Sequence, residues 1–184
     1  MFAVHTPETA PEGARRTIEA TTKQFGYLPE AVARLASSPE LLNGFLQLNA
    51  QFEKSTLDPL AREVIVMTIA TRNACHVCVA MHTAKLTGMA AEPEVIAALR
   101  ESKPLADERL EAVRAFTLEV IATAGAVGDE ALRAFTAHGF TTRNALEVVL
   151  GIGAYTLSTL ANRMTDAPLD EQVKPFAWQA AGPN

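Results

Sequence analysis

The sequence predicts an all-α fold, packed as an antiparallel helical bundle. Segments with helical spacing of apolar residues follow one another along nearly the whole chain, and Pro, Gly and Asn separate them. No run alternates apolar and polar residues with hairpin-turn chemistry between two halves, so no strand is expected. The connections between predicted helices are short, which favours antiparallel neighbours. We expect one helical domain over residues 1–184.

The predicted helices have recognisable start and stop signals. The first covers residues 12–25 and ends at Gly26, and a short one covers 29–36. Ser38 and Asp58 are N-cap residues, each followed by proline at the first helical position. Helices therefore begin there and are expected to run to about residue 54 and to an interruption at 72–74. Further helices are expected over 75 to about 88, 93–100, 107–124, 129 to about 139 and 142–164, before a proline-rich tail.

The helix over residues 142–164 is apolar on most of its sides. A helix of this kind is usually buried all round, either at the centre of a domain or in a contact between subunits. A homo-oligomer is therefore expected.

Composition restricts the partners and the compartment. The net charge is −5 and no basic run is present, which argues against a nucleic acid or an anionic membrane as partner. The N-terminus lacks a charged segment followed by an apolar stretch, so no signal peptide is expected. The longest apolar segment, 145–161, contains Gly151, Gly153, Tyr155 and Ser158, and falls short of the roughly 18 apolar residues that a membrane span requires. These features favour a cytoplasmic protein.

The most informative motif is a pair of cysteines with a histidine nearby. Cys75 and Cys78 are the only cysteines of the chain, and His82 follows within the same predicted helix. At 3.6 residues per turn the three side chains fall within roughly 60° around the helix axis. In a chain of cytosolic character such a pair is more often catalytic or metal-binding than a structural disulfide. Thiols beside an imidazole at a helix start can form a thiolate and a reversible disulfide.

Local geometry suggests how the thiols are activated. Asn73 can cap the following helix, which would place Cys75 and Cys78 in its first turn, where free N–H groups and the helix dipole lower the pKa of a thiol. His82 lies one turn after Cys78 on the same face, so its ring can reach that sulfur directly or through one water and accept its proton.

Glu63 is the expected partner of His82. The midpoint between these two residues falls between Arg72 and Asn73, where the helical pattern is interrupted. If the chain folds back there as a helical hairpin, residues equally far from the turn lie side by side. In one unbroken helix they would be about 28 Å apart and could not interact.

Each feature also has a plainer interpretation. The cysteines could be buried apolar fillers in a non-catalytic interaction protein, His82 a structural histidine, and Glu63 a favourable acid in the first turn of its helix. Zinc is the rival chemistry, but the cysteine pair is only half of a zinc site and no second pair of ligands has zinc-like spacing. We therefore expect no metal and no organic cofactor.

The spacing E-x11-C-x2-C-x3-H, formed by Glu63, Cys75, Cys78 and His82, resembles the signature of alkylhydroperoxidase D-like proteins in the carboxymuconolactone decarboxylase family. The resemblance implies an all-helical fold and assembly as a trimer or hexamer. It implies that Cys78 attacks the peroxide as a thiolate, that Cys75 is the resolving thiol, and that Glu63 and His82 relay protons. The implied partners are a small hydroperoxide and an external dithiol or thiol–disulfide protein as electron donor.

The resemblance has one departure. Well-known members carry a further histidine directly before the second cysteine, where this chain has Val77, and the histidine inside the motif is His76 instead. Family members that decarboxylate a lactone acid lack the paired cysteines. The sequence therefore predicts a thiol-dependent peroxidase or disulfide oxidoreductase of the peroxiredoxin type with an antioxidant role. The alternative is a non-redox lyase that uses Glu63 or His82 as a general base in the same helical pocket.

Overall fold

A computed structural model describes residues 2–180 of the chain. These residues form nine α-helices and one short 3-10 helix, without a strand, and each predicted helix is present to within about two residues at its ends. The 3-10 helix was not predicted, because the segment after residue 164 was expected to be a proline-rich tail without regular structure. The elements are α1 (Glu12–Phe25), α2 (Glu30–Leu35), α3 (Pro39–Glu53), α4 (Pro59–Arg72), α5 (His76–Gly88), α6 (Pro93–Arg100), α7 (Glu108–Ala122), α8 (Asp129–Ala137), α9 (Thr142–Met164) and η1 (Glu171–Phe176).

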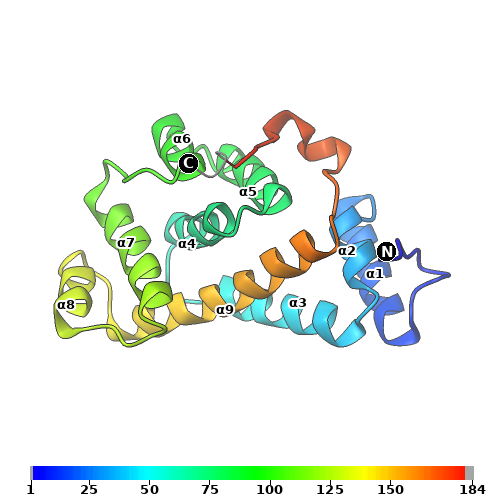
Figure 1. The fold of residues 1–184 in the computed structure, drawn as a ribbon, viewed down its shortest axis with the longest axis horizontal. Helices are drawn as coiled ribbons and strands as arrows, with labels where there is room; N and C mark the ends of the chain where they lie inside the picture. Colours follow the sequence, from blue (N-terminus) through cyan, green and yellow to red (C-terminus); the bar gives the residue numbers. More distant parts are fainter. Residues whose placement is uncertain (1, 181–184) are drawn as a thin grey trace.

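The helical hairpin of α4 and α5 lies at the centre of the fold (Figure 1). Helices α9 and α3 run beside each other along one side of the hairpin. Helices α6 and α7 also pack against α4. At the end of the molecule near the N-terminus, α1 and α2 lie against α3 and α9. A separate apolar cluster joins these elements, with Ile18 of α1, Leu42 of α3 and Ala161 of α9 among its members.

Helix α4 is buried on all sides over its second half. Residues 63–71 are all buried, and Glu63 is the only charged residue among them. A helix that is enclosed in this way is apolar around its whole circumference, as the sequence of α4 is. Burying a carboxylate in such a helix requires partners that compensate its lost hydration, so the surroundings of Glu63 decide whether it can be charged.

The turn between α4 and α5 differs from the prediction. Asn73 does not cap α5; it follows the last residue of α4, and its Nδ2 donates a hydrogen bond to Thr159 Oγ1 at 2.8 Å. Ala74, at φ 51°, forms the left-handed residue of a Schellman-type helix end, in which the Cys75 N–H bonds to the carbonyl of Ala70. Because this motif uses two residues after α4, the N-cap of α5 is Cys75 itself.

Within the single chain the last helix is buried on only part of its surface. Of the two expected settings, the centre of the domain and a contact between subunits, the first is therefore excluded. Half of α9's most apolar stretch is buried, while Leu146, Val149, Leu160 and Met164 are exposed. Their spacing places them along one side of the helix. Among residues 2–180, α9 is the one helix that is long and apolar enough to cross a membrane by length and composition, and it packs against α3 and α4 within the helical domain.

Gly151 of α9 lies in close contact with α3 and α4. A Cβ atom there would lie 2.7 Å from a ring carbon of Phe52 and 3.1 Å from a methyl group of Ile65, and both side chains are fully buried. We expect Gly151→Ala to lower the free energy of unfolding by about 1–3 kcal/mol, the usual effect of overpacking. Gly153→Ala is the control, because a Cβ there meets nothing within 4 Å.

Gly153 lies on the exposed side of α9, so alanine there should raise the free energy of unfolding by about 0.5–1 kcal/mol through helix propensity. Urea denaturation of both variants measures the difference. Equal effects of the two substitutions would contradict the close contact at Gly151.

Candidate active site

The two cysteines are free thiols in direct contact at the start of α5. Their Sγ atoms lie 2.6 Å apart, and the Sγ of Cys75 also accepts a hydrogen bond from the backbone N–H of Cys78 at 3.4 Å. Cys75, as the N-cap residue, therefore uses its sulfur to satisfy a free backbone donor of the first turn, a role usually filled by an oxygen.

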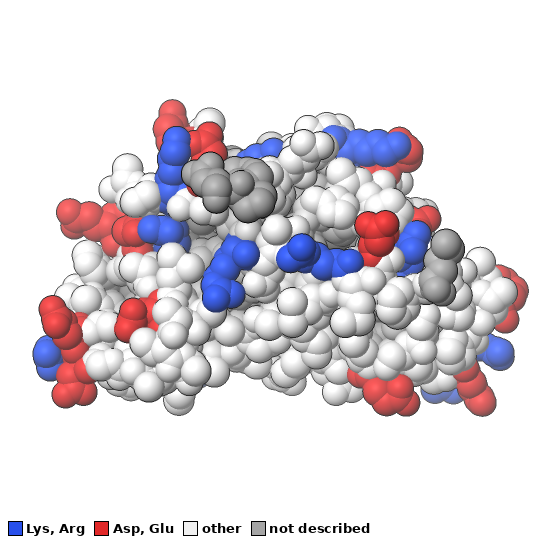
Figure 2. All heavy atoms as spheres, viewed as in Figure 1, with Lys and Arg blue, Asp and Glu red and all other residues white. Residues whose placement is uncertain are grey.

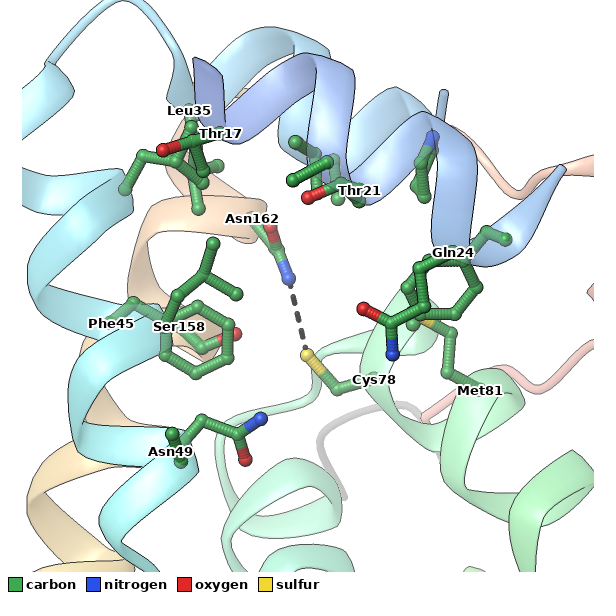
Figure 3. Close-up of a pocket in the computed structure, with 18 of the residues that line it drawn as sticks. Thr17, Thr21, Gln24, Leu35, Phe45, Asn49, Cys78, Met81, Ser158 and Asn162 are labelled. Atoms are coloured by element: carbon green, nitrogen blue, oxygen red, sulfur yellow. Dashed lines mark hydrogen bonds between the residues drawn. The ribbon is translucent and has the colours of Figure 1, made fainter. Parts of the chain in front are cut away.

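Only one of the two sulfurs faces a cavity. A cavity of about 800 Å³ is bounded by α1, α2, α3, α5 and α9, and Cys78 is one of its lining residues whereas Cys75 is not. Figure 3 shows the Cys78 sulfur pointing into this space, with Phe45 and Met81 among the side chains around it. Cys75 is 1% exposed and Cys78 4% exposed. A molecule that enters the cavity therefore meets the sulfur of Cys78 first.

The two thiols differ in acidity. The hydrogen-bonded contact with Cys78 lowers the pKa of Cys75, and the backbone N–H groups at the start of α5 and the Asn162 amide act in the same direction, against the effect of burial. The contact with Cys75 and burial raise the pKa of Cys78, although Asn162 and Ser158 oppose this rise. The predicted lowering of thiol pKa at the helix start is thus found for Cys75 and reversed for Cys78. Negative charge is therefore favoured on the sulfur of Cys75, whereas the sulfur of Cys78 is the one that a molecule in the cavity can reach.

Glu63 and His82 form a buried pair, as the register of the hairpin predicts. The Oε2 of Glu63 lies 2.7 Å from Nδ1 of His82, and Glu63 is 1% exposed. The Tyr155 ring and the imidazole pack in a T-shaped arrangement, at 5.3 Å between centroids. Because Nδ1 is bonded to the carboxylate, the neutral ring keeps Nε2 as its proton acceptor.

His82 does not contact the thiols directly. Among residues 2–180 no hydrogen bond joins its ring to either sulfur, but His82 and Cys78 line the same cavity. A proton that passes between them must therefore cross the cavity, through solvent or through a bound molecule. The direct hydrogen bond that was one form of the predicted contact is therefore absent from the described residues, and the water-mediated form stays a prediction.

Lys85 completes the environment of Glu63. Its Nζ lies 2.8 Å from the Oε1 of Glu63 and 2.8 Å from the Oε1 of Glu53 on α3. Burial raises the pKa of Glu63, but the pairing with His82 and Lys85 outweighs it, so the pKa is lowered and the carboxylate is charged. Sequence reasoning missed Lys85, although its position three residues after His82 places it on the same helical face.

Helix α9 supplies polar groups that sequence reasoning also missed. Asn162 donates a hydrogen bond from Nδ2 to the Sγ of Cys78 at 3.3 Å, and Ser158 lines the cavity one turn earlier. The spacing of two polar residues four apart within an apolar helix was the available signal. Tyr155 is buried and also lines the cavity. Glu147 is outside the cavity lining and accepts hydrogen bonds from Thr56.

The residues at the departure from the motif lie outside the cavity lining. Val77 is fully buried in the main core, and the partly exposed His76 begins α5. Within residues 2–180, no three side chains of His, Cys, Asp or Glu are grouped so that they could hold a metal ion.

Comparisons with known proteins agree with this arrangement. The model of the carboxymuconolactone decarboxylase family matches residues 39–119, the segment that holds Glu63, both cysteines and His82. No curated protein matches the chain in sequence.

Solved structures are similar over nearly the whole chain. The crystal structure of a peroxidase-related protein from Ralstonia eutropha JMP134 with an alkylhydroperoxidase AhpD core is 22% identical, with a TM-score of 0.82 over 94% of this chain and 93% of that one. A peroxidase-related protein from Silicibacter sp. TM1040 is 19% identical, with a TM-score of 0.76 over 94% of this chain and 91% of that one. At such identities the likeness establishes a shared fold.

Proposed function

We propose that this chain, whose residues 39–119 match the model of the carboxymuconolactone decarboxylase family and whose fold is shared with a structure that has an alkylhydroperoxidase AhpD core, is a cytoplasmic thiol-dependent peroxidase with an antioxidant role. The observation that carries the proposal is that the two adjacent sulfurs differ in their access to the cavity. Cys78 faces the cavity, and Cys75 lies directly behind it, within reach for a disulfide. A second thiol in this position gives an oxidised sulfur an intramolecular partner.

In the first step the Sγ of Cys78 attacks the terminal oxygen of a hydroperoxide. Because its pKa is raised, Cys78 has to lose its proton to a base, and the free Nε2 of His82 is the base on the same cavity wall. A sulfur–oxygen bond forms while the oxygen–oxygen bond breaks, which leaves a sulfenic acid on Cys78 and an alkoxide. The protonated His82, held by Glu63, then returns the proton to the alkoxide and releases an alcohol.

In the second step Cys75 resolves the oxidised sulfur. Its sulfur attacks the sulfenic acid of Cys78, a disulfide forms, and water leaves. An external dithiol or thiol–disulfide protein then reduces the disulfide, and the two electrons that reduced the peroxide are replaced. The lowered pKa of Cys75 favours this step, because a thiolate is the attacking form of a thiol.

The cavity favours an organic hydroperoxide with an apolar body as the substrate. Its volume of about 800 Å³ lies within the usual range for small-molecule sites, and aliphatic and aromatic side chains such as Leu35, Leu42 and Phe45 form much of its wall. Hydrogen peroxide would leave most of this apolar surface without a contact.

The proposal is tested by following peroxide consumption. The purified chain, supplied with a dithiol and an alkyl hydroperoxide, should consume the peroxide in proportion to the dithiol oxidised. A non-redox lyase of the same fold, which would use Glu63 or His82 as a general base, would act without any thiol supply. Turnover of a substrate that is independent of dithiol and unaffected by loss of the cysteines would therefore favour the lyase over the peroxidase.

We further propose that the chain associates with copies of itself through α9. The exposed apolar residues of α9 form a stripe, and the face of the molecule over α9 is largely free of charge in its lower middle part (Figure 2). Large apolar stripes of this kind commonly mark contacts between proteins. A symmetric homo-oligomer is the simplest assembly that covers the stripe.

The double substitution Val149→Glu with Leu160→Glu should convert the oligomer into monomers, because it places charges within the stripe. Val4→Glu is a matched control, since Val4 is an exposed apolar residue outside α9. Sedimentation equilibrium measures the mass of each variant. A wild-type chain that is monomeric at high concentration would contradict the proposed contact.

A further inference from the structure

The amide of Asn162 reaches the proposed attacking sulfur from the neighbouring helix. Figure 3 shows the side chain pointing from α9 to Cys78, with Nδ2 at 3.3 Å from Sγ. Asn162 is 5% exposed and lies 84 residues from Cys78 in the chain, so only the packing of α9 against the hairpin brings the two together.

The orientation of this amide indicates that the sulfur of Cys78 needs a hydrogen-bond donor. The Oδ1 of Asn162 is buried and accepts no hydrogen bond from the described part of the chain. A buried acceptor without a partner costs free energy, which a turned amide could avoid by placing Oδ1 against a thiol proton. The observed orientation is favourable when the sulfur presents lone pairs or negative charge, because these need a donor.

We infer that Asn162 is a catalytic residue whose amide N–H stabilises the thiolate of Cys78 while this sulfur attacks the peroxide. The inference rests on the proposed function, in which Cys78 is the attacking residue. A hydrogen bond to a charged sulfur is stronger than one to a neutral thiol, so the contact favours the deprotonated form.

Asn162 is a neutral hydrogen-bond donor, and the titratable groups around Cys78 have to be considered beside it. Contact with Cys75 and burial raise the pKa of Cys78, and a negative charge on Cys75 opposes a second one, while Asn162 and Ser158 lower it. The remaining titratable and charged groups around the cavity are Arg16 on α1, Glu53 on α3, His82 and Lys85 on α5, and Tyr155 on α9, with Glu63 of α4 behind His82. The charges of Glu63 and Lys85 are already paired with each other.

The experiment measures the reactivity of Cys78 alone. In a Cys75→Ser background, the rate of alkylation by iodoacetamide is followed against pH in chains with Asn162, Asn162→Leu and Asn162→Asp. Both substitutions should slow alkylation at neutral pH by about tenfold or more and move its pH profile upward, because a hydrogen bond to a charged group is lost. The aspartate variant adds a negative charge beside the sulfur and should be slower still.

Asn43→Leu is the control, because Asn43 on α3 bonds to Thr17 and Gly13 and is not part of the cavity lining. Circular dichroism confirms that each variant is folded. Unchanged alkylation profiles in both folded Asn162 variants, with peroxide turnover intact, would overturn the role of Asn162 alone. A shifted profile in a chain that consumes no peroxide would support thiolate stabilisation by Asn162 and contradict the proposed peroxidase function.

Discussion

Cys78→Ser should abolish thiol-dependent peroxide consumption, reducing it to the uncatalysed rate. Serine keeps the size of the side chain, but its hydroxyl is neither nucleophilic enough to attack a peroxide nor able to form a sulfenic acid. The loss is expected to be complete because Cys78 is the cysteine that lines the cavity. Dithiol oxidation and peroxide loss, followed together, measure the effect.

Cys75→Ser is the matched variant and should behave differently. Its Cys78 can still attack, so one equivalent of peroxide should be consumed per chain in a rapid first turnover, after which the reaction stalls at the sulfenic acid. A reagent that traps sulfenic acids should label Cys78 in this variant and not in the wild-type chain, where Cys75 closes the disulfide. Full steady-state turnover in Cys78→Ser would remove the mechanism, and the absence of a first turnover in Cys75→Ser would show that Cys75 takes the proton from Cys78.

Much of the fold and part of the site could be predicted from the sequence, because local chemistry determined them. The proline after Ser38 and after Asp58 marked the start of α3 and α4, where both side chains accept the expected capping hydrogen bonds. The pairing of Glu63 with His82 followed from the hairpin, since residues equally distant from a tight turn must meet.

The rest depended on contacts between distant segments. Nothing near Cys78 in the sequence indicates that Asn162 donates to its sulfur, because the packing of α9 on the hairpin decides it. The cap of α5 was misassigned because Asn73 is a good N-cap by residue type, whereas the Schellman-type end of α4 uses Ala74 and shifts the N-cap to Cys75. Because of that shift the two thiols have different surroundings. The sulfur of Cys75, at the N-cap, accepts a hydrogen bond from a backbone N–H, whereas the sulfur of Cys78 faces the cavity.

The proposed reaction needs a base because the thiol with the lowered pKa is not the thiol that faces the cavity. A cavity-facing thiol with a lowered pKa would be a thiolate without help, but here the lowered pKa belongs to the enclosed Cys75. Cys78 has a raised pKa, so its attack requires proton removal and stabilisation of the charge that remains. In the proposed mechanism, His82 and Glu63 remove the proton, and Asn162 stabilises the charge.

Glu63→Gln and His82→Asn should each lower kcat/KM for peroxide by about 100- to 10,000-fold, the usual contribution of a general base. His82→Asn removes the base. Glu63→Gln keeps the shape of the side chain but removes the negative charge that lies 2.7 Å from the imidazole and pairs with Lys85, so the His82 ring loses the carboxylate that orients it. Steady-state assays with an alkyl hydroperoxide measure both effects.

The double variant distinguishes a relay from two separate contributions. If Glu63 acts only through His82, combining the substitutions should lower kcat/KM no further than His82→Asn alone. Glu147→Gln is the matched control: Glu147 is also a buried glutamate, but it holds Thr56 and Asn144 outside the cavity, so its loss should affect stability and leave turnover unchanged. Additive losses from Glu63 and His82 would mean that the carboxylate acts on the reaction by another route, with Lys85 as the first candidate because it pairs with the same carboxylate at the cavity wall.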